Sequence, residues 1–217
     1  TIDDITANEV TAVNLIAAGT TGTVTATIDG NAAQLDDLAA SGTAATCAFT
    51  ITIDDTATLA QAKTIVAATT GSVTFSAKIT DSVANLKAGT TDFADLTTVT
   101  ARTTDVAIDI NDAAFATSNT TVAATDLSGI GSDTTGTVTV SNAIKITGTL
   151  AQCVAALKTD ASKVVAATAI VNISDAPITS SDANVTALND VAGATSGVVT
   201  ASFASSAISR LANLTTA

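Results

Sequence analysis

The fold is decided by one stretch, Phe49-Thr50-Ile51-Thr52-Ile53-Asp54-Asp55-Thr56-Ala57. Its first five residues alternate between apolar residues and Thr, which is the pattern of a β-strand buried on one face. Two acidic residues then end the run, and an Ala- and Leu-rich segment with a helical pattern follows over residues 56–69. The stretch therefore predicts a strand, an acidic corner and a helix.

The same unit recurs along the chain. Corners at which an apolar residue is followed by polar and then small residues lie 25 to 36 residues apart. They begin at Ile2, Ile28, Ile53, Ile79, Ile110, Ile146, Ile173 and Phe203. Such spacing is typical of repeat proteins, in which each unit packs only against its neighbours. Since alternate units are alike, we predict one domain of four double repeats, over residues 1–52, 53–109, 110–172 and 173–217.

Glycines mark every second unit. There the helical segment runs into Thr-Thr-Gly or Thr-Ser-Gly, and a strand follows at once, at Gly22, Gly71, Gly136 and Gly197. This placement predicts a helix-terminating glycine with a positive φ. In the other units the predicted helices are shorter, over residues 33–38, 83–86, 150–157 and 208–214. The glycine-containing insert at residues 128–132 is predicted to be a loop.

The strand phasing indicates how the sheet is covered. Strands separated by a helix run parallel when they share a sheet. One face of the predicted sheet carries apolar residues such as Ile28 and Ile51, and the other carries Thr, interrupted by Lys78 and Asp109. We therefore predict an α/β repeat fold, a solenoid-like stack of strand–helix units with a parallel sheet, helices on one face and a Thr-rich exposed face. A two-layer sheet with some antiparallel pairing is the alternative.

The composition excludes several classes of function. The chain of 217 residues is 47% hydrophobic but only 2% aromatic, so its core is built from Ala, Val, Ile and Leu. A net charge of −12 argues against binding to nucleic acid and to anionic membrane surfaces. No run of 18 apolar residues occurs, so we expect no membrane insertion, and no signal peptide is recognised.

The corner acids are the candidate metal ligands. They are Asp3, Asp4, Asp29, Asp54, Asp55, Asp81, Asp112 and Asp175. Carboxylates stacked at strand spacing along one edge could share Ca²⁺, and Asp54, Asp55, Asp81 and Asp112 are the residues predicted to do so. The alternative is that these acids cap the helices that follow them. No other cofactor is predicted, because the glycines match no nucleotide-binding fingerprint.

Two cysteines, Cys47 and Cys153, are predicted to be buried free thiols. Four repeats of stacking would separate them by about 19 Å, which is too far for a disulfide. The chain contains no His to activate a thiol or to complete a zinc site, and no Trp or Tyr to form a sugar-binding platform. We therefore predict no catalytic residues and no enzyme. Four Asn-x-Ser/Thr sequons begin at Asn119, Asn172, Asn184 and Asn213.

Two motifs carry a resemblance to a known class of protein. They are Thr69-Thr70-Gly71-Ser72-Val73-Thr74 and Thr80-Asp81-Ser82-Val83-Ala84-Asn85-Leu86. The chain resembles tandem repeats of very large secreted bacterial surface proteins, among them cyanobacterial proteins linked to surface motility and cell-surface layers. The resemblance implies an extracellular location at the cell surface, a structural or adhesive role and a dependence on calcium. It implies no catalytic residues.

These observations lead to two hypotheses about function. The chain begins at a strand end and finishes after a predicted helix, so its two ends are complementary in register. We therefore expect copies to stack head to tail, or to be continued in a longer chain, as part of an extracellular filament or layer. The alternative is an adhesion module that binds ice or a glycan through the Thr-rich face.

Overall fold

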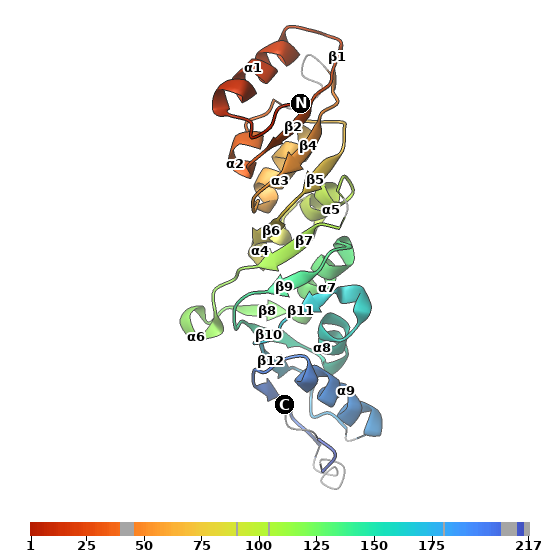
Figure 1. The fold of residues 1–217 in the computed structure, drawn as a ribbon. Coiled ribbons are helices and arrows are strands. Elements are labelled where there is room, and N and C mark those ends of the chain that lie inside the picture. The colour runs from red at the N-terminus through yellow and green to blue at the C-terminus, as the bar shows by residue number, and fades with distance from the viewer. Residues whose placement is uncertain (40–45, 90, 104, 180, 205–211, 215–217) are drawn as a thin grey trace. The chain divides into compact units, whose positions relative to one another are not determined.

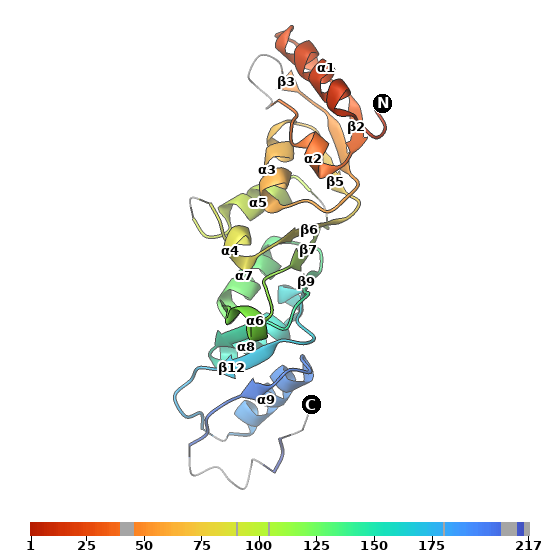
Figure 2. The same ribbon diagram turned by 90° about the vertical axis from the view of Figure 1, so that its left-hand side faces the viewer.

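The computed structural model describes residues 1–39, 46–89, 91–103, 105–179, 181–204 and 212–214. It shows an α/β fold in which the paired strands run parallel, so this part of the predicted fold is confirmed. The chain forms two compact units, one of Thr1–Asp81 with Asn85–Ile108, and one of Ser82–Ala84 with Asp109–Ala217. Figures 1 and 2 show the elements of each unit in two views.

The first unit begins with a helix and then alternates short strands with helices. Its helices are α1 (Ala7–Ala18), α2 (Ala32–Leu35), α3 (Leu59–Ala67) and α5 (Ala94–Thr100). Its strands are β1 (Thr23–Val24), β2 (Thr27–Gly30), β3 (Thr46–Cys47), β4 (Thr50–Ile53), β5 (Val73–Phe75) and β6 (Lys78–Asp81). The strands pair in the orders β1-β3 and β2-β4-β5. The elements α4 (Val83–Leu86) and β7 (Ala107–Ile110) contribute residues to both units.

The second unit repeats this scheme. Its helices are α6 (Phe115–Ser118), α7 (Ala124–Asp133), α8 (Leu150–Leu157) and α9 (Asp182–Gly193), with a short 3₁₀ helix at Asp160–Ser162. Its strands are β8 (Thr121–Ala123), β9 (Val138–Val140), β10 (Lys145–Gly148), β11 (Val164–Val165), β12 (Ile170–Ile173) and β13 (Val199–Thr200). They pair in the orders β8-β10-β12-β13 and β9-β11. The helices predicted at 83–86 and 150–157 are confirmed, whereas residues 208–211 of the last predicted helix lie outside the described residues.

Most of the predicted strands are divided into two short strands, whereas the run that ends at Ile110 forms the single strand β7. The first run forms β1 and β2, and the run that ends at Ile53 forms β3 and β4. The corners are also offset from the predicted alignment. Ile2 pairs with Ile28 as predicted, but Gly30 rather than Ile28 lies opposite Ile53. The offset is two residues, so it leaves each side chain on the same face of the sheet. The period-two pattern therefore predicted the faces correctly although the predicted alignment of the corners was wrong.

Alternate burial along the strands follows the predicted faces. Ile28, Ile51 and Ile53 are buried, whereas Thr27 and Thr50 are exposed. One residue departs from this pattern. Asp109 was predicted on the exposed face but is buried, and the Ser141 hydroxyl donates a hydrogen bond to its carboxylate. The partner hydroxyl compensates for desolvation of the charge, which explains how an acid occupies this position.

Two of the four predicted helix-terminating glycines, Gly71 and Gly197, have another role. Among the described glycines only Gly89 has a positive φ, so the prediction of a positive φ at these four positions was wrong. A Cβ atom at Gly71 would overlap the carbonyl of Phe49 in the preceding repeat, and one at Gly197 would overlap the carbonyl of Ala169. Glycine is therefore required because two backbones approach closely. Nearby, the Thr69 hydroxyl donates to the Phe49 carbonyl at 2.7 Å and accepts from the Gly71 N–H at 2.9 Å.

The insert at residues 128–132 is helical. It lies inside α7, so the predicted loop was wrong. A Cβ atom at Gly131 would overlap the carbonyl of Ser162, so this glycine also permits a close backbone contact. Gly131, one of the two glycines that suggested a loop, is explained by packing, because glycine in a helix allows another segment to approach the helix axis.

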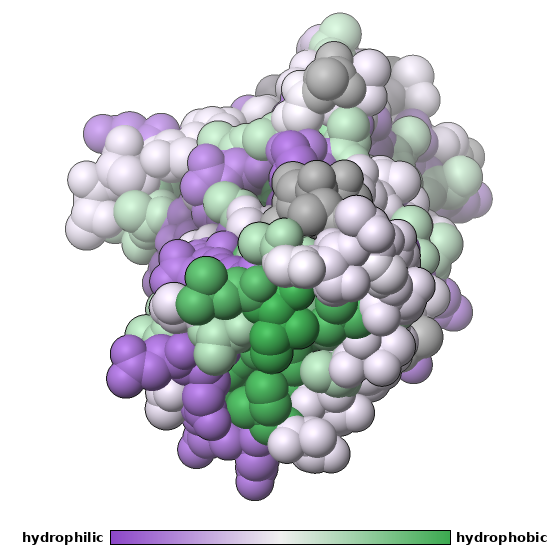
Figure 3. All heavy atoms as spheres, turned by 90° about the horizontal axis from the view of Figure 1, so that it is seen from above, coloured by the Kyte–Doolittle hydropathy of each residue, from purple (hydrophilic) through white to green (hydrophobic). Residues whose placement is uncertain are grey.

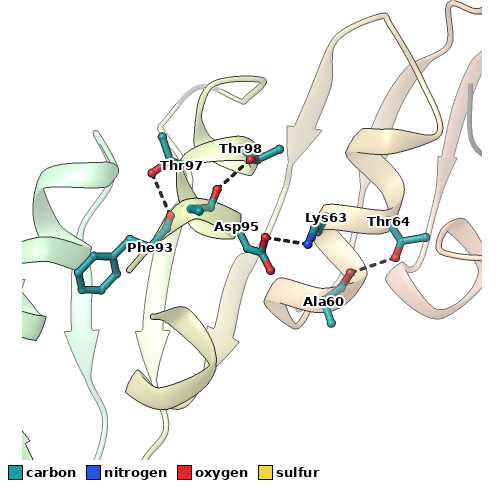
Figure 4. Close-up of polar contacts among 8 residues, drawn as sticks. Ala60, Lys63, Thr64, Phe93, Asp95, Thr97 and Thr98 are labelled. Carbon is teal, nitrogen blue, oxygen red and sulfur yellow. Dashed lines mark hydrogen bonds and ion pairs between the residues drawn. The ribbon is translucent and has the colours of Figure 1, made fainter. Parts of the chain in front are cut away.

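Helices pack against their neighbours within each unit. Contacts join α1 to α2, α2 to α3 and α3 to α5, and in the second unit α7 to α8 and α8 to α9. Figure 4 shows the ion pair that connects α3 with α5, in which Lys63 Nζ lies 2.7 Å from Asp95 Oδ1. Within the described part of the chain, no helix is both long and apolar enough to cross a bilayer.

Candidate functional site

Four of the corner acids each connect the start of a helix to the following repeat. In the clearest case, the backbone N–H of Leu59 at the start of α3 donates to Asp81 Oδ2 at 3.1 Å. The same contact is made by Ala32 to Asp55 at 2.7 Å, by Val83 to Asp112 at 2.7 Å and by Leu150 to Asp175 at 2.6 Å. The acid comes 22 to 29 residues after its partner. Each of these carboxylates therefore binds a free N–H at the start of the helix in the preceding repeat.

The prediction that these acids cap the helices that follow them was therefore wrong in detail. Most of the longer helices have another N-cap, and three of these caps form a reciprocal capping box with Glu or Gln three residues later. The three boxes are Thr6 with Glu9, Thr58 with Gln61, and Thr149 with Gln152. The Thr-x-x-Glu/Gln pattern is visible in the sequence and is the signal that would have placed these helix starts correctly.

Of the four predicted calcium ligands, Asp55, Asp81 and Asp112 each accept from a different helix N-terminus. Asp54 instead shares a hydrogen bond with Asp29, which raises the pKa of Asp54 to about 6, with further contributions from desolvation and from the charges of Asp29, Asp4 and Asp3. No His, Cys, Asp or Glu residues come together in threes or more as a metal site in the described ranges. Calcium binding therefore stays a prediction. In the described ranges the four carboxylates do not come together as one set of ligands.

Both cysteines are buried free thiols, as predicted. Burial raises the pKa of the Cys47 thiol. The pKa of Cys153 rises to about 11, because the side chain is desolvated and because the Asp175 carboxylate disfavours the thiolate. A raised pKa lowers the fraction of reactive thiolate, so neither cysteine has the environment of a nucleophile.

A groove in the second unit lies against α8 and α9. Its volume is about 710 Å³, and Leu150, Val154, Ile178 and Ala187 line it together with Asp175. The carboxylate already accepts from the Leu150 N–H, so it is engaged in holding the helix start. Thr149, Thr179 and Asn184 also line the groove, so its lining is mixed, and it holds one carboxylate rather than the pair of acids that hydrolytic catalysis requires.

The Thr residues of the first unit form short columns on the exposed face. The parallel register places Thr27 beside Thr50, and Thr52 beside Thr74. Thr27, Thr50 and Thr74 are exposed, and Thr52 is half-buried. These columns extend over neighbouring strands and follow directly from the period-two pattern.

One surface was missed by the sequence analysis. Helix α1 buries Val10, Val13 and Ala17, but it also exposes 69% of Leu15 and 60% of Ile16. Ala12 and Gly19 are exposed as well, and the spacing 12, 15, 16, 19 forms one helical stripe. We call these four residues the α1 face. Figure 3 shows hydrophobic surface gathered on the side of the molecule where α1 lies.

Later helices bury the corresponding position. Ile16 comes ten residues after the N-cap Thr6, as Ala68 does after Thr58 and Val191 after Ser181. Ala68 and Val191 are both fully buried, and their helices α3 and α9 pack against the helix that precedes each of them, α2 and α8. The described residues contain no helix before α1, and Ile16 is exposed. The signal in the sequence was the second apolar stripe on α1.

Comparison of the chain with protein-family models, with curated proteins and with solved structures finds no significant match.

Proposed function

We propose that this chain is a structural rather than a catalytic protein, a self-assembling subunit or segment of an extracellular filament or surface layer. The proposal takes the two units to belong to one open, solenoid-like stack of repeats. Stacks of this kind bury each repeat against its neighbours and leave terminal surfaces that can accept further repeats. The acidic composition and the resemblance to repeats of secreted surface proteins support the extracellular location.

The observation that carries the proposal is the α1 face. Leu15 and Ile16 expose large apolar side chains on a helix whose opposite side is packed. Exposed apolar stripes of this kind mark interaction surfaces, because burying them removes apolar area from water. Head-to-tail stacking, as predicted from the sequence, would also need a complementary surface in the last repeat. Residues 205–211 and 215–217 of that repeat lie outside the described residues, so the proposal rests on the first repeat.

The test is the association state. Sedimentation velocity from about 1 µM to about 1 mM, with and without Ca²⁺, should show assembly that increases with concentration. Electron microscopy of the concentrated sample should then show filaments or sheets. A compact monomer at every concentration, in both the presence and absence of calcium, would overturn the proposal.

A second candidate function is adhesion through the Thr columns, which the alignment of Thr27 with Thr50 and of Thr52 with Thr74 favours. An ordered surface such as ice, or a glycan, would be the ligand. Replacing Thr50 and Thr74 by Lys should abolish thermal hysteresis or glycan binding and leave self-association intact. If the variant keeps the thermal hysteresis or glycan binding of the wild type, that result would count against the adhesion function.

A further inference from the structure

The α1 face has a defined orientation within the first unit. Asn14 lies on the side of α1 that meets the next repeat, because its side chain donates to the Asp37 carbonyl at 2.9 Å and accepts from the Ala39 N–H at 2.8 Å. Successive helical residues are rotated by about 100°, so Ala12 and Ile16, two positions on either side, point almost directly away from that contact. The α1 face is therefore on the side of the helix opposite the packed repeat.

The residues of the α1 face are arranged symmetrically. In the order 12, 15, 16, 19 they read small, large, large, small, as Ala, Leu, Ile and Gly. A two-fold axis between positions 15 and 16 would set Leu15 against Ile16 of a second copy, and Ala12 against Gly19. Small residues at the outer positions let the helices approach closely, while the central pair supplies the apolar area. The face is thus complementary to itself in an antiparallel pairing.

Charge also favours the antiparallel arrangement. The chain carries −12, so two copies repel each other over most of their surfaces. Residues 10–28 contain no charged side chain, and Glu9 is the only charge on α1. Antiparallel pairing would hold the two Glu9 residues roughly 20 Å apart, beyond the screening length of about 10 Å at 0.1 M salt. Parallel pairing would set them side by side.

We propose that the α1 face binds the α1 face of a second copy of this chain in an antiparallel, two-fold contact. The inference rests on the proposed self-association and specifies its geometry at this surface. The stripe is smaller than the roughly 1,200 Å² of a stable interface, so we expect a weak dimer with a Kd on the order of 10–100 µM. Further contacts elsewhere on the chain would be needed to extend the dimer into a filament.

Two variants test the contact. Leu15→Lys places like charges at the two-fold axis and keeps a good helix former near the helix C-terminus, so the fold should persist. We expect sedimentation equilibrium to show at least a tenfold weaker dimer. Val165→Lys is the matched control, because Val165 is 50% exposed on β11, in the other unit, and is not part of the α1 face. Dimerisation of this variant should be unchanged. Circular dichroism should be the same for all three proteins.

Leu15→Cys tests the symmetry. A two-fold axis between positions 15 and 16 passes beside residue 15 of both copies, so the two introduced thiols lie on either side of the axis. Mild oxidation should therefore give a disulfide-linked dimer, which a head-to-tail contact would not. Cys47 and Cys153 are buried and should not compete. Two outcomes would show that the two-fold contact is wrong while the wild type still associates. In one, Leu15→Lys associates as strongly as the wild type; in the other, Leu15→Cys does not form the cross-linked dimer. Self-assembly would then stand, and head-to-tail stacking would be one arrangement left. If the wild type is monomeric throughout, both proposals fail.

Discussion

The Asp81 carboxylate accepts a hydrogen bond from the backbone N–H of Leu59, the first residue of α3, 22 residues earlier in the chain. Asp81 is buried and also accepts from the Asn85 side chain at 2.6 Å. The bond joins a strand end in one repeat to a helix start in the repeat before it. This contact, repeated at Asp55, Asp112 and Asp175, is what the acidic corners do in the fold.

Asp81→Ala should therefore destabilise the first unit. The substitution leaves the buried Leu59 N–H without its acceptor, which costs about 1–3 kcal/mol of unfolding free energy. Asp81→Asn keeps an acceptor oxygen and should cost less. Asp92→Ala is the control, because this exposed carboxylate pairs only loosely with Lys87, at 3.5 Å, and should change stability by less than about 0.5 kcal/mol. Urea unfolding measures all three, and equal losses for Asp81→Ala and Asp92→Ala would contradict the assignment.

Two glycine substitutions should have opposite effects. Gly71→Ala forces a Cβ atom into the carbonyl of Phe49, so we expect a loss of at least about 2 kcal/mol. Gly193→Ala, at the end of α9, meets nothing within 4 Å and should be neutral or stabilising by up to about 1 kcal/mol. Thermal unfolding of the two variants distinguishes close backbone approach from a general intolerance of Ala at glycine positions.

The Asp29–Asp54 pair should make stability depend on pH. The pKa of Asp54 in the folded chain is raised from 3.8 to about 6, so the folded state holds this proton more tightly than the unfolded state. The contribution of Asp54 to stability is therefore highest below about pH 4 and falls as pH rises from about 4 to about 6. Asp54 is exposed, so the change should be small. Asp54→Asn should remove this decrease in stability between pH 4 and pH 6. An NMR titration of Asp54 with a midpoint near pH 4 would contradict the raised pKa.

Calcium acts on the same acids if the sequence prediction is right. Ca²⁺ binding to Asp54 and Asp29 would neutralise their repulsion and raise the melting temperature at pH 7, which is above the pKa of Asp54. The comparison is thermal unfolding with Ca²⁺ and with Mg²⁺ at equal ionic strength. A rise specific to Ca²⁺ that is lost in Asp54→Asn would support the site. Equal effects of the two ions would indicate screening alone.

The two thiols should report unfolding. Cys47 and Cys153 are buried and their pKa values are raised, so at pH 8 they should react with a thiol reagent only as the chain opens. Adding urea should accelerate the reaction in step with unfolding. The Leu15→Cys variant supplies an exposed thiol as the positive control, which should react within minutes in the folded protein. Rapid labelling of the native cysteines would show that their surroundings open locally.

Sequence patterns predicted the strands well because burial on one face imposes a period of two. The alternation at residues 49–53 placed Phe49, Ile51 and Ile53 in the core, and a misaligned corner did no harm because the offset was even. Helices at 83–86 and 150–157 were equally recognisable, because their apolar spacing matches the α-helical period. The buried state of both cysteines followed from the same local patterns.

The role of each corner acid depended on contacts between distant residues. Local patterns suggest that an acid after a strand caps the next helix, but Asp81 reaches back 22 residues to Leu59. That pairing is set by the strand register, which places the end of one strand beside the helix start of the preceding repeat. The requirement for Gly71 is of the same kind, since it arises from the approach of the Phe49 carbonyl.

By itself, the sequence determined the α/β class, the faces of the strands and the acidic, His-free composition, because these depend on residue type and local periodicity. The tertiary structure decided which N–H the carboxylates of Asp55, Asp81, Asp112 and Asp175 bind, why Gly71 and Gly197 are needed, and that Leu15 and Ile16 of α1 face solvent. These properties depend on how repeats lie beside one another, and distances between residues 20 or more positions apart are fixed only when the chain is folded.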